Sequence, residues 1–123
     1  VEEFHRIYKL GNSEKPIGKL ENQKENLRFD LMKEENEEYL EAAKNGDIVE
    51  VADALGDMMY ILCGTIIEHG MQHIIEEVFD EIHRSNLSKL DENGNPIYRE
   101  DGKVIKGPNY FPPDIKKIMK KYL

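Results

Sequence analysis

The sequence predicts an all-α protein, a bundle of four to five helices with a small β-hairpin near its C-terminal end. Two observations lead to this prediction. Apolar residues recur with helical spacing from residue 21 to about residue 86, and glycine and proline then divide the rest into short pieces. A chain of 123 residues fits one hydrophobic core. We therefore expect a single domain over residues 1–123, with the hairpin and tail at about 91–123.

The first half of the chain predicts a short helix, a loop and a long helix. Glu2–Leu10 has a helical pattern, and the Gly/Pro/Ser-containing segment Gly11–Gly18 is typical of a loop. Helical periodicity then begins at Glu21. Its apolar positions recur at multiples of about 3.6 residues: Leu27, Leu31, Leu40 and Ala43. Asn45-Gly46 is a helix stop.

A second long helix is predicted from Ile48 to about Glu68, with Asp47 as its N-cap. Its apolar face is wider than a surface helix needs: Val51, Leu55, Met58, Met59, Leu62 and Ile66. We expect it to be the most buried helix. Beyond Gly70, a further amphipathic helix is marked by Ile74, Ile75, Val78, Phe79 and Ile82.

The pattern changes after Asn86. Ile97–Arg99 and Lys103–Ile105 flank the turn residues Glu100–Gly102, which predicts a hairpin. The tail Ile115–Tyr122 again has apolar residues at helical spacing.

Composition excludes several classes of protein. Seventeen basic and twenty-five acidic residues give a net charge of −8, which argues against binding to nucleic-acid polymers or anionic membranes. The longest apolar run, Met58–Cys63, is too short to cross a bilayer. Cys63 is the only cysteine, so no internal disulfide is possible. We expect a cytoplasmic protein.

The acidic residues are concentrated in the two long helices. Residues 30–57 hold ten acids and two bases, a charge equal to that of the whole chain. Helices joined by a short turn lie antiparallel, so the acids of one should face those of the other. Helical spacing puts three acids on one side of each helix: Glu34, Glu35 and Glu38, then Glu50, Asp53 and Asp57.

Two interpretations of these acids are open, a solvated face or a metal site. Carboxylates about 6 Å apart repel by about 3 kcal/mol at an effective dielectric of 20, so a converging group needs a cation. Glu37 and Glu41 fit the solvated face. Four others fit a divalent ion: Glu35, Glu38, Asp53 and Asp57. All-oxygen ligands favour Mg²⁺ or Mn²⁺ over zinc.

These motifs resemble a known family. Glu34-Glu35-x-x-Glu38 is followed by Asp53-Ala54-Leu55-Gly56-Asp57 and Met58-Met59-Tyr60, and downstream come His83–Lys89 and Asp101–Tyr110. Together they resemble the MazG-like and phosphoribosyl-ATP pyrophosphohydrolase-like proteins, which are all-α nucleoside triphosphate pyrophosphohydrolases. The resemblance extends from about residue 26 to residue 114.

The resemblance implies hydrolysis of a nucleoside triphosphate, (d)NTP, to the monophosphate and pyrophosphate. It also implies Mg²⁺ as the cofactor, with Mn²⁺ as an alternative. By position, Glu35, Glu38 and Asp57 would be metal ligands. Asp53 would be a ligand or a water-orienting base, and Glu34 a neighbouring ligand or base. The proton acceptor would be Glu34, Glu35 or Asp53, in a metal-assisted attack by water at the α–β linkage.

One position departs from the family pattern. The second motif often has Glu three residues before its final Asp, where this chain has Ala54. Either Asp53 or Glu50 must then supply the missing carboxylate, and both assignments stay open.

Basic residues follow later in the chain. We expect Arg84 and Lys89 to contact phosphate and Asn86 to hold the nucleoside, with Lys103 and Lys106 as further substrate contacts. The alternative is a solvated helix end and ordinary hairpin lysines.

Members of the family that this chain resembles are oligomeric. Short helices also leave apolar surface exposed unless helices of two subunits pair, so we expect a homodimer or homotetramer.

Two other functions are compatible with the sequence. One is hydrolysis of phosphoribosyl-ATP in histidine biosynthesis, although the lysines at 103 and 106 favour a general nucleotide substrate. The other is a metal-stabilised helical binding module without turnover.

Overall fold

The computed structural model describes residues 1–123, and the chain is all-α with no extended strands. Contacts within the chain divide it into two compact units, Val1–Gln72 and His73–Leu123, and each is described by itself. The helices are α1 (Glu2–Ile7), the 3₁₀ turn η1 (Glu21–Gln23), α2 (Lys24–Lys44), α3 (Ile48–Glu68), α4 (Ile75–Leu87) and α5 (Ile115–Lys120). No helix is both long enough and apolar enough to cross a membrane. That the two units form one domain stays a prediction.

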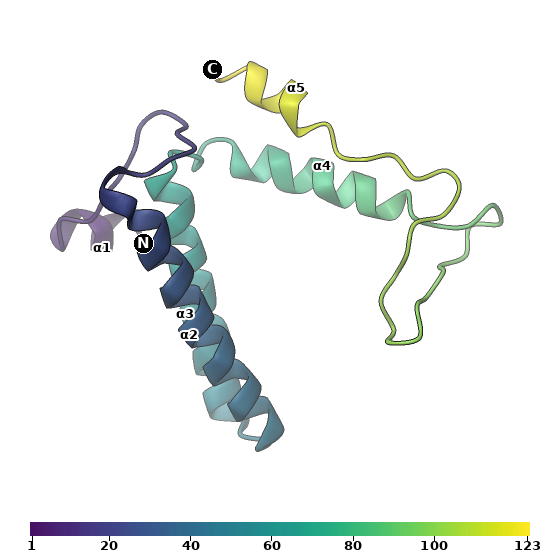
Figure 1. The fold of residues 1–123 in the computed structure, drawn as a ribbon, viewed down its shortest axis with the longest axis horizontal. Coiled ribbons are helices and arrows are strands. Elements are labelled where there is room, and N and C mark those ends of the chain that lie inside the picture. The colour runs from purple at the N-terminus through teal and green to yellow at the C-terminus, as the bar shows by residue number, and fades with distance from the viewer. The chain divides into compact units, whose positions relative to one another are not determined.

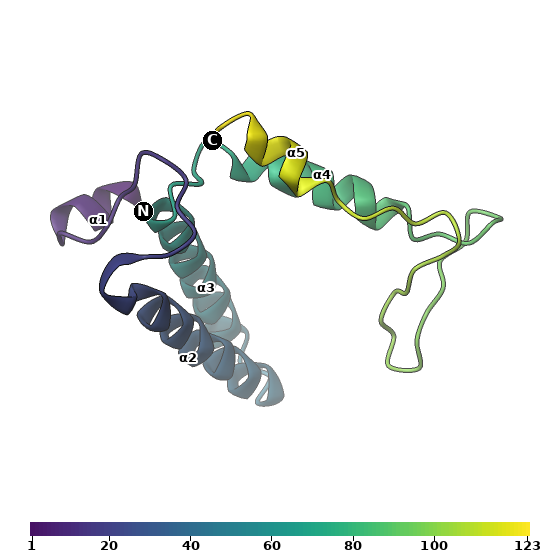
Figure 2. The same cartoon turned by 45° about the horizontal axis from the view of Figure 1, so that its top comes forward.

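The first unit is built on the antiparallel pair of α2 and α3, which lie side by side in Figures 1 and 2. The turn between them has Gly46 at φ 66°, a conformation that glycine adopts without strain. Asp47 caps α3 by accepting a hydrogen bond from the backbone N–H of Glu50 at 3.1 Å. Ala42 and Ala54 are buried, one on each helix. Local signals therefore confirm both the predicted turn and the predicted start of α3.

The loop after α1 is bound to the far end of α3. The backbone N–H groups of Ser13 and Ile17 donate to the carbonyls of Ile67 and His69, at 3.1 and 2.9 Å. The Ser13 hydroxyl also donates to the carbonyl of Glu68 at 2.8 Å. These bonds satisfy carbonyl groups that the end of a helix leaves without partners.

Three segments meet at Gly64 of α3. A Cβ atom there would lie 2.5 Å from His5 Nε2 and 2.7 Å from Arg28 Nη2. Arg28 donates from Nε to Thr65 Oγ1 at 3.0 Å and from Nη2 to the Ile61 carbonyl at 2.7 Å. Both His5 and Arg28 are buried. Only glycine leaves room for this approach of α1 and α2 to α3.

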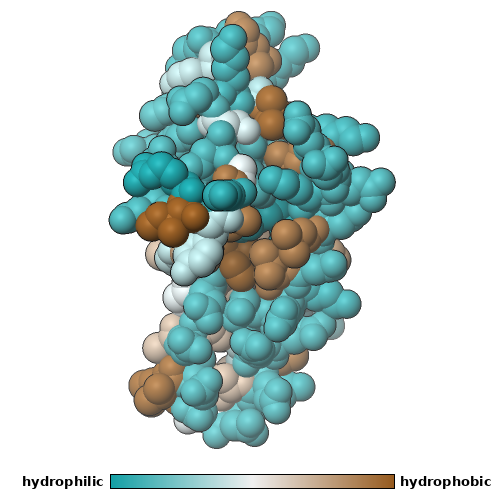
Figure 3. All heavy atoms as spheres, turned by 90° about the vertical axis from the view of Figure 1, so that its left-hand side faces the viewer, coloured by the Kyte–Doolittle hydropathy of each residue, from teal (hydrophilic) through white to brown (hydrophobic).

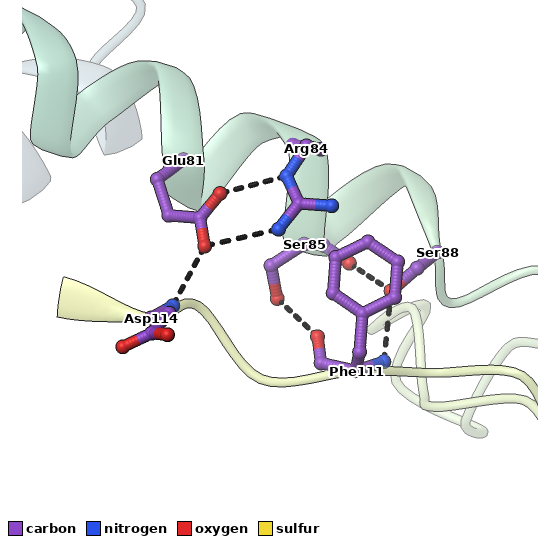
Figure 4. Close-up of polar contacts among 6 residues, drawn as sticks. All are labelled: Glu81, Arg84, Ser85, Ser88, Phe111 and Asp114. Carbon is purple, nitrogen blue, oxygen red and sulfur yellow. Dashed lines mark hydrogen bonds and ion pairs between the residues drawn. The ribbon is translucent and has the colours of Figure 1, made fainter. Parts of the chain in front are cut away.

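In the second unit, the segment leading into α5 is bound to α4 (Figure 4). The buried hydroxyl of Ser85 donates to the Phe111 carbonyl at 2.8 Å, and the Phe111 N–H donates to Ser88 Oγ at 3.1 Å. The Asp114 N–H donates to Glu81 Oε2 at 2.7 Å. These contacts hold α5 alongside α4.

The predicted β-hairpin is reduced to a single antiparallel bridge between Tyr98 and Val104. A hydrogen bond of 2.8 Å from the Arg99 N–H to the Lys103 carbonyl closes the turn, and Gly102 lies in it with φ 88°. The turn was predicted correctly, but the two strands were not. An isolated two-stranded hairpin with no further strand or apolar support is marginal in water.

As expected, α3 has more buried residues than any other helix: Ala54, Gly64, Ile67 and Glu68. Much of its apolar face is nevertheless exposed in the single chain. Met59 is 69% exposed, and Leu55 and Leu62 are each 50% exposed. Within its unit, α3 packs mainly against α2, with a small contact from α1, and these are too few elements to cover a wide apolar face. Hydrophobic side chains are visible among hydrophilic ones on the surface in Figure 3.

Candidate functional site

Glu35 lies at the centre of the acidic residues of α2 and α3. Its carboxyl is half-buried, and its Oε2 atom has no hydrogen-bond partner. Burial, a hydrogen bond with Glu38, and the negative charges of Glu38, Asp57 and Glu34 raise the pKa of Glu35 to about 7. The structure therefore brings together acids from both helices, as the antiparallel arrangement predicts, and their repulsion is not offset by a basic side chain.

The acidic surface continues toward the turn between the helices as a cavity of about 340 Å³. Five acidic side chains and no basic one line it: Glu38, Glu41, Asp47, Glu50 and Asp53. Glu38 belongs both to this cavity and to the surroundings of Glu35. We call the carboxylates around Glu35 and this cavity, together, the acidic cluster.

The chemistry of the acidic cluster fits a hard divalent cation. The buried, unpartnered oxygen of Glu35 and the raised pKa of its carboxyl both indicate that positive charge would be favourable there. The side chains are not gathered into a closed site, because no group of three or more acidic, histidine or cysteine side chains encloses a metal position. The ligand roles of Glu35, Glu38, Asp53 and Asp57 stay predictions.

Ala54, where the family pattern often has Glu, is only 3% exposed. Its side chain is buried in the first unit and has no oxygen to offer. Glu50 and Asp53 lie near it in α3, and both line the cavity. Either can therefore supply a carboxylate on the same side of the helix, and the two alternatives remain.

The other glutamates of α2 differ from Glu35. Glu34 is exposed and acts on Glu35 through its charge. Glu37 is exposed and forms an ion pair with Lys33 at 4.0 Å, which agrees with its predicted place on a solvated face. Glu37 therefore serves as an internal control for substitutions in the cluster.

Arg84, a predicted phosphate contact, is held by other residues of the second unit (Figure 4). Its Nε and Nη2 atoms donate to the two oxygens of Glu81 at 2.7 and 3.1 Å. Its guanidinium lies 4.4 Å from the centre of the Phe111 ring. The hydrogen bonds from Arg84 and from the Asp114 backbone lower the pKa of Glu81 to about 2.

Arg84 also lines a cavity of about 560 Å³ in which four acidic side chains face three basic ones. A cavity lined by both acidic and basic side chains attracts a polyphosphate less strongly than a cavity lined by basic side chains alone.

The remaining predicted substrate contacts also belong to the second unit. Asn86 is exposed on α4, and Lys89 is half-buried just after it. Lys103 is exposed at the turn, and Lys106 lies 4.7 Å from the centre of the Tyr110 ring. None of these four side chains forms a hydrogen bond with another, and their substrate roles stay predictions.

Sequence reasoning did not identify the ion pair of Glu81 or the hydrogen bond of Ser85 to Phe111. Glu81 precedes Arg84 by three residues, a spacing that could have signalled the ion pair on α4. The hydrogen bond from Ser85 to Phe111 joins residues 26 positions apart and leaves no local signal. Both residues contribute to holding the chain before α5 rather than to the acidic cluster.

Comparison with known proteins supports the same family as the motifs. The family model for phosphoribosyl-ATP pyrophosphohydrolase matches residues 1–86. An uncharacterized protein of Acanthamoeba polyphaga mimivirus is 31% identical over 98 residues, or 77% of this chain. The chain spans only 35% of the length of that relative.

A solved structure shows a similar fold. It is a protein from Exiguobacterium sp. 255-15 named as a candidate NTP pyrophosphohydrolase, with a TM-score of 0.50 and 20% identity. The similarity covers 99% of this chain and 95% of that one. The all-α fold, the acidic cluster on two antiparallel helices and the match to the family model over residues 1–86 agree, and the chain belongs to the phosphoribosyl-ATP pyrophosphohydrolase family.

Proposed function

We propose that this protein is a Mg²⁺-dependent nucleoside triphosphate pyrophosphohydrolase that converts a (d)NTP to the (d)NMP and pyrophosphate. The observation that carries the proposal is the environment of Glu35, where a half-buried carboxyl lies among three other acids and no basic side chain offsets them. A protein gains nothing in stability from such an arrangement by itself. It becomes useful where a dication and a polyanionic substrate are brought together.

Glu35, Glu38 and Asp57 would hold the ion, with Asp53 or Glu50 completing the set. The bound ion would neutralise charge on the phosphoryl oxygens and lower the pKa of an attacking water. Glu34, Glu35 and Asp53 are the candidates for accepting the proton of that water. A general base works best with a pKa near the working pH, and before any cation binds the pKa of Glu35 is about 7.

Two substrate classes are compatible with family membership. The match to the phosphoribosyl-ATP pyrophosphohydrolase model favours phosphoribosyl-ATP. The exposed lysines at 103 and 106 favour a general nucleoside triphosphate, because their positive charges can attract the triphosphate group of any nucleotide. We give the general nucleotide precedence and treat phosphoribosyl-ATP as the second candidate.

We also propose that the chain works as a homodimer or homotetramer. The apolar face of α3 supports this, since Met59, Leu55 and Leu62 are at least half exposed in the single chain. Apolar surface of this kind is favourable when a second helical surface covers it. Light scattering after gel filtration should give a mass of two or four chains, and Met59→Glu should lower that mass.

Pyrophosphate release tests the enzymatic proposal. The full chain is assayed with Mg²⁺ and with Mn²⁺ on canonical and modified (d)NTPs and on phosphoribosyl-ATP. Glu38→Gln and Asp57→Asn should each reduce kcat/KM by about a hundredfold or more if they hold the ion. Glu37→Gln, on the same helix but facing solvent, should leave it unchanged.

The pattern of results separates the alternatives. Pyrophosphate from (d)NTPs and none from phosphoribosyl-ATP supports the first candidate, and the reverse supports the second. Release from neither substrate, with Glu38→Gln changing only thermal stability, would leave a metal-stabilised binding module and refute the enzymatic proposal.

A further inference from the structure

A second polar cavity lies at the other end of α2 and α3 from the acidic cluster. It has a volume of about 220 Å³, opens to solvent and is lined by the loop after α1, the turn before α2, the start of α2 and the end of α3. Ile17 and Leu20 form its apolar lining, and its polar side chains are those of Ser13, Glu21, Lys24 and Glu68. At about 30 Å³ per water, the space suits a molecule of six to eight non-hydrogen atoms.

Glu68 is the unusual residue in this cavity. It is only 5% exposed, and its Oε2 atom forms an ion pair with the buried Arg28, whose Nε lies 3.5 Å away. The other oxygen, Oε1, lies beside Gly11 and accepts no hydrogen bond from the protein. A donor from outside the chain would therefore be favourable at Oε1.

Gly11 provides the space beside this carboxylate. A Cβ atom at Gly11 would lie 3.4 Å from Glu68 Oε1 and 3.5 Å from Lys24 Nζ. Lys24 and Glu68 nevertheless form no ion pair, so these two charged atoms are more than 4.0 Å apart. Glu68 Oε1 and Lys24 Nζ therefore flank one small gap from two sides without contacting each other.

The cavity is separate from the acidic cluster. Glu68 follows Asp57 in the same helix by eleven residues, which is about 16 Å at 1.5 Å per residue. That distance exceeds the reach from the α-phosphate of a nucleotide to its own base. The cavity is thus not the base pocket of a nucleotide bound at the cluster of the same chain.

We propose that this cavity binds a small zwitterion, an α-amino acid with a short aliphatic side chain. Its ammonium group donates to Glu68, and its carboxylate accepts from Lys24, each at about 2.8 Å. The ammonium and carboxylate groups of an amino acid are attached to the same carbon. With hydrogen bonds of this length, they can bridge the space between Glu68 and Lys24, which is too wide for a direct ion pair between the two side chains. The aliphatic side chain packs against Ile17 and Leu20.

Calorimetric titration of the full chain with L-valine and L-alanine tests this proposal without any assay of hydrolysis. Both should bind saturably, whereas acetate and methylammonium, which carry one charge each, should not. Gly11→Ala should weaken binding of valine about ten- to a hundredfold, because its methyl group fills the gap at ordinary contact distances. Lys24→Met should weaken it similarly, and Lys19→Met, outside the cavity, should not.

Thermal unfolding shows whether each variant is folded, and Gly11→Ala should unfold at the temperature of the parent. If Gly11→Ala is less stable, Lys24→Met carries the test, since Lys24 makes no hydrogen bond or ion pair that its loss would break. Absence of saturable binding of either amino acid overturns the proposal. Equal binding by parent and Lys24→Met, or equal binding of acetate, overturns it as well. Loss of pyrophosphate release at the acidic cluster would leave all these outcomes unchanged.

Discussion

Replacing Glu35 with glutamine tests whether the acidic cluster is strained by repulsion before a cation binds. The folded protein raises the pKa of this carboxyl from 4.5 to about 7. The proton is therefore bound more tightly in the folded state than in the unfolded state. Below pH 4.5 both states are protonated and the shift costs nothing. As pH rises from 4.5 to 7, the unfolded state ionises first, so the free energy of unfolding falls, and the full cost is present above pH 7.

The size of this effect follows from the shift. A rise from 4.5 to about 7 corresponds to at most about 3 kcal/mol. The carboxyl is half-buried, so solvent screens part of the repulsion and we expect about 1–2 kcal/mol. Glutamine keeps the shape and the donor toward Glu38 but cannot ionise. In metal-free buffer Glu35→Gln should therefore be about 1–2 kcal/mol more stable than the parent at pH 8 and equally stable at pH 4.

Urea unfolding at a series of pH values, without divalent ions and then with Mg²⁺, measures this difference. Mg²⁺ should stabilise the parent and have a smaller effect on Glu35→Gln, because one of the proposed ligands has lost its charge. Glu37→Gln is the control, since Glu37 faces solvent beside Lys33. Parallel pH curves for the parent and Glu35→Gln would refute the argument, as would equal stabilisation of both by Mg²⁺.

Two further predictions concern positions outside the acidic cluster. Gly64→Ala places a methyl group against His5 and Arg28, so it should lower the free energy of unfolding by about 1–3 kcal/mol in urea. A smaller loss from Gly64→Ala in a His5→Ala background than in the parent would confirm that the clash with His5 is part of the cause, and an equal loss in both would contradict it. The lowered pKa of Glu81, about 2, stabilises the folded state above pH 4.5, and this contribution is lost as pH falls from 4.5 to 2. Glu81→Gln should remove that acid dependence from the amide exchange of Asp114, and an unchanged profile would contradict the assignment.

The helices were predictable because their limits are set by local chemistry. Ile48–Glu68 has the predicted bounds, since Gly46 supplies the turn and Asp47 supplies the cap. The convergence of Glu35 with Glu38 and acids of α3 also follows from spacing, because helical periodicity fixes which side chains share a side and a short turn fixes the antiparallel pairing.

Contacts between distant segments were not predictable from spacing. The apolar pattern of α3 marks a face but does not say what covers it, and in the single chain Met59 stays exposed. Arg84 was expected to contact phosphate, yet its guanidinium contacts Glu81 and the ring of Phe111. Phe111 is 27 positions away, so only the folded chain brings it to Arg84.

The bonding of the Ser13–Ile17 loop to the end of α3 has a consequence for the order of folding. The α2–α3 pair closes across a three-residue turn, whereas the hydrogen bond from Ser13 to Ile67 must close a loop of more than fifty residues. Closing the longer loop costs more chain entropy and is slower. The helical hairpin with its carboxylates should thus form early, and the N-terminal segment should dock last and detach first. Pulse-labelled exchange during refolding should accordingly protect the amides of the α2–α3 hairpin before that of Ser13.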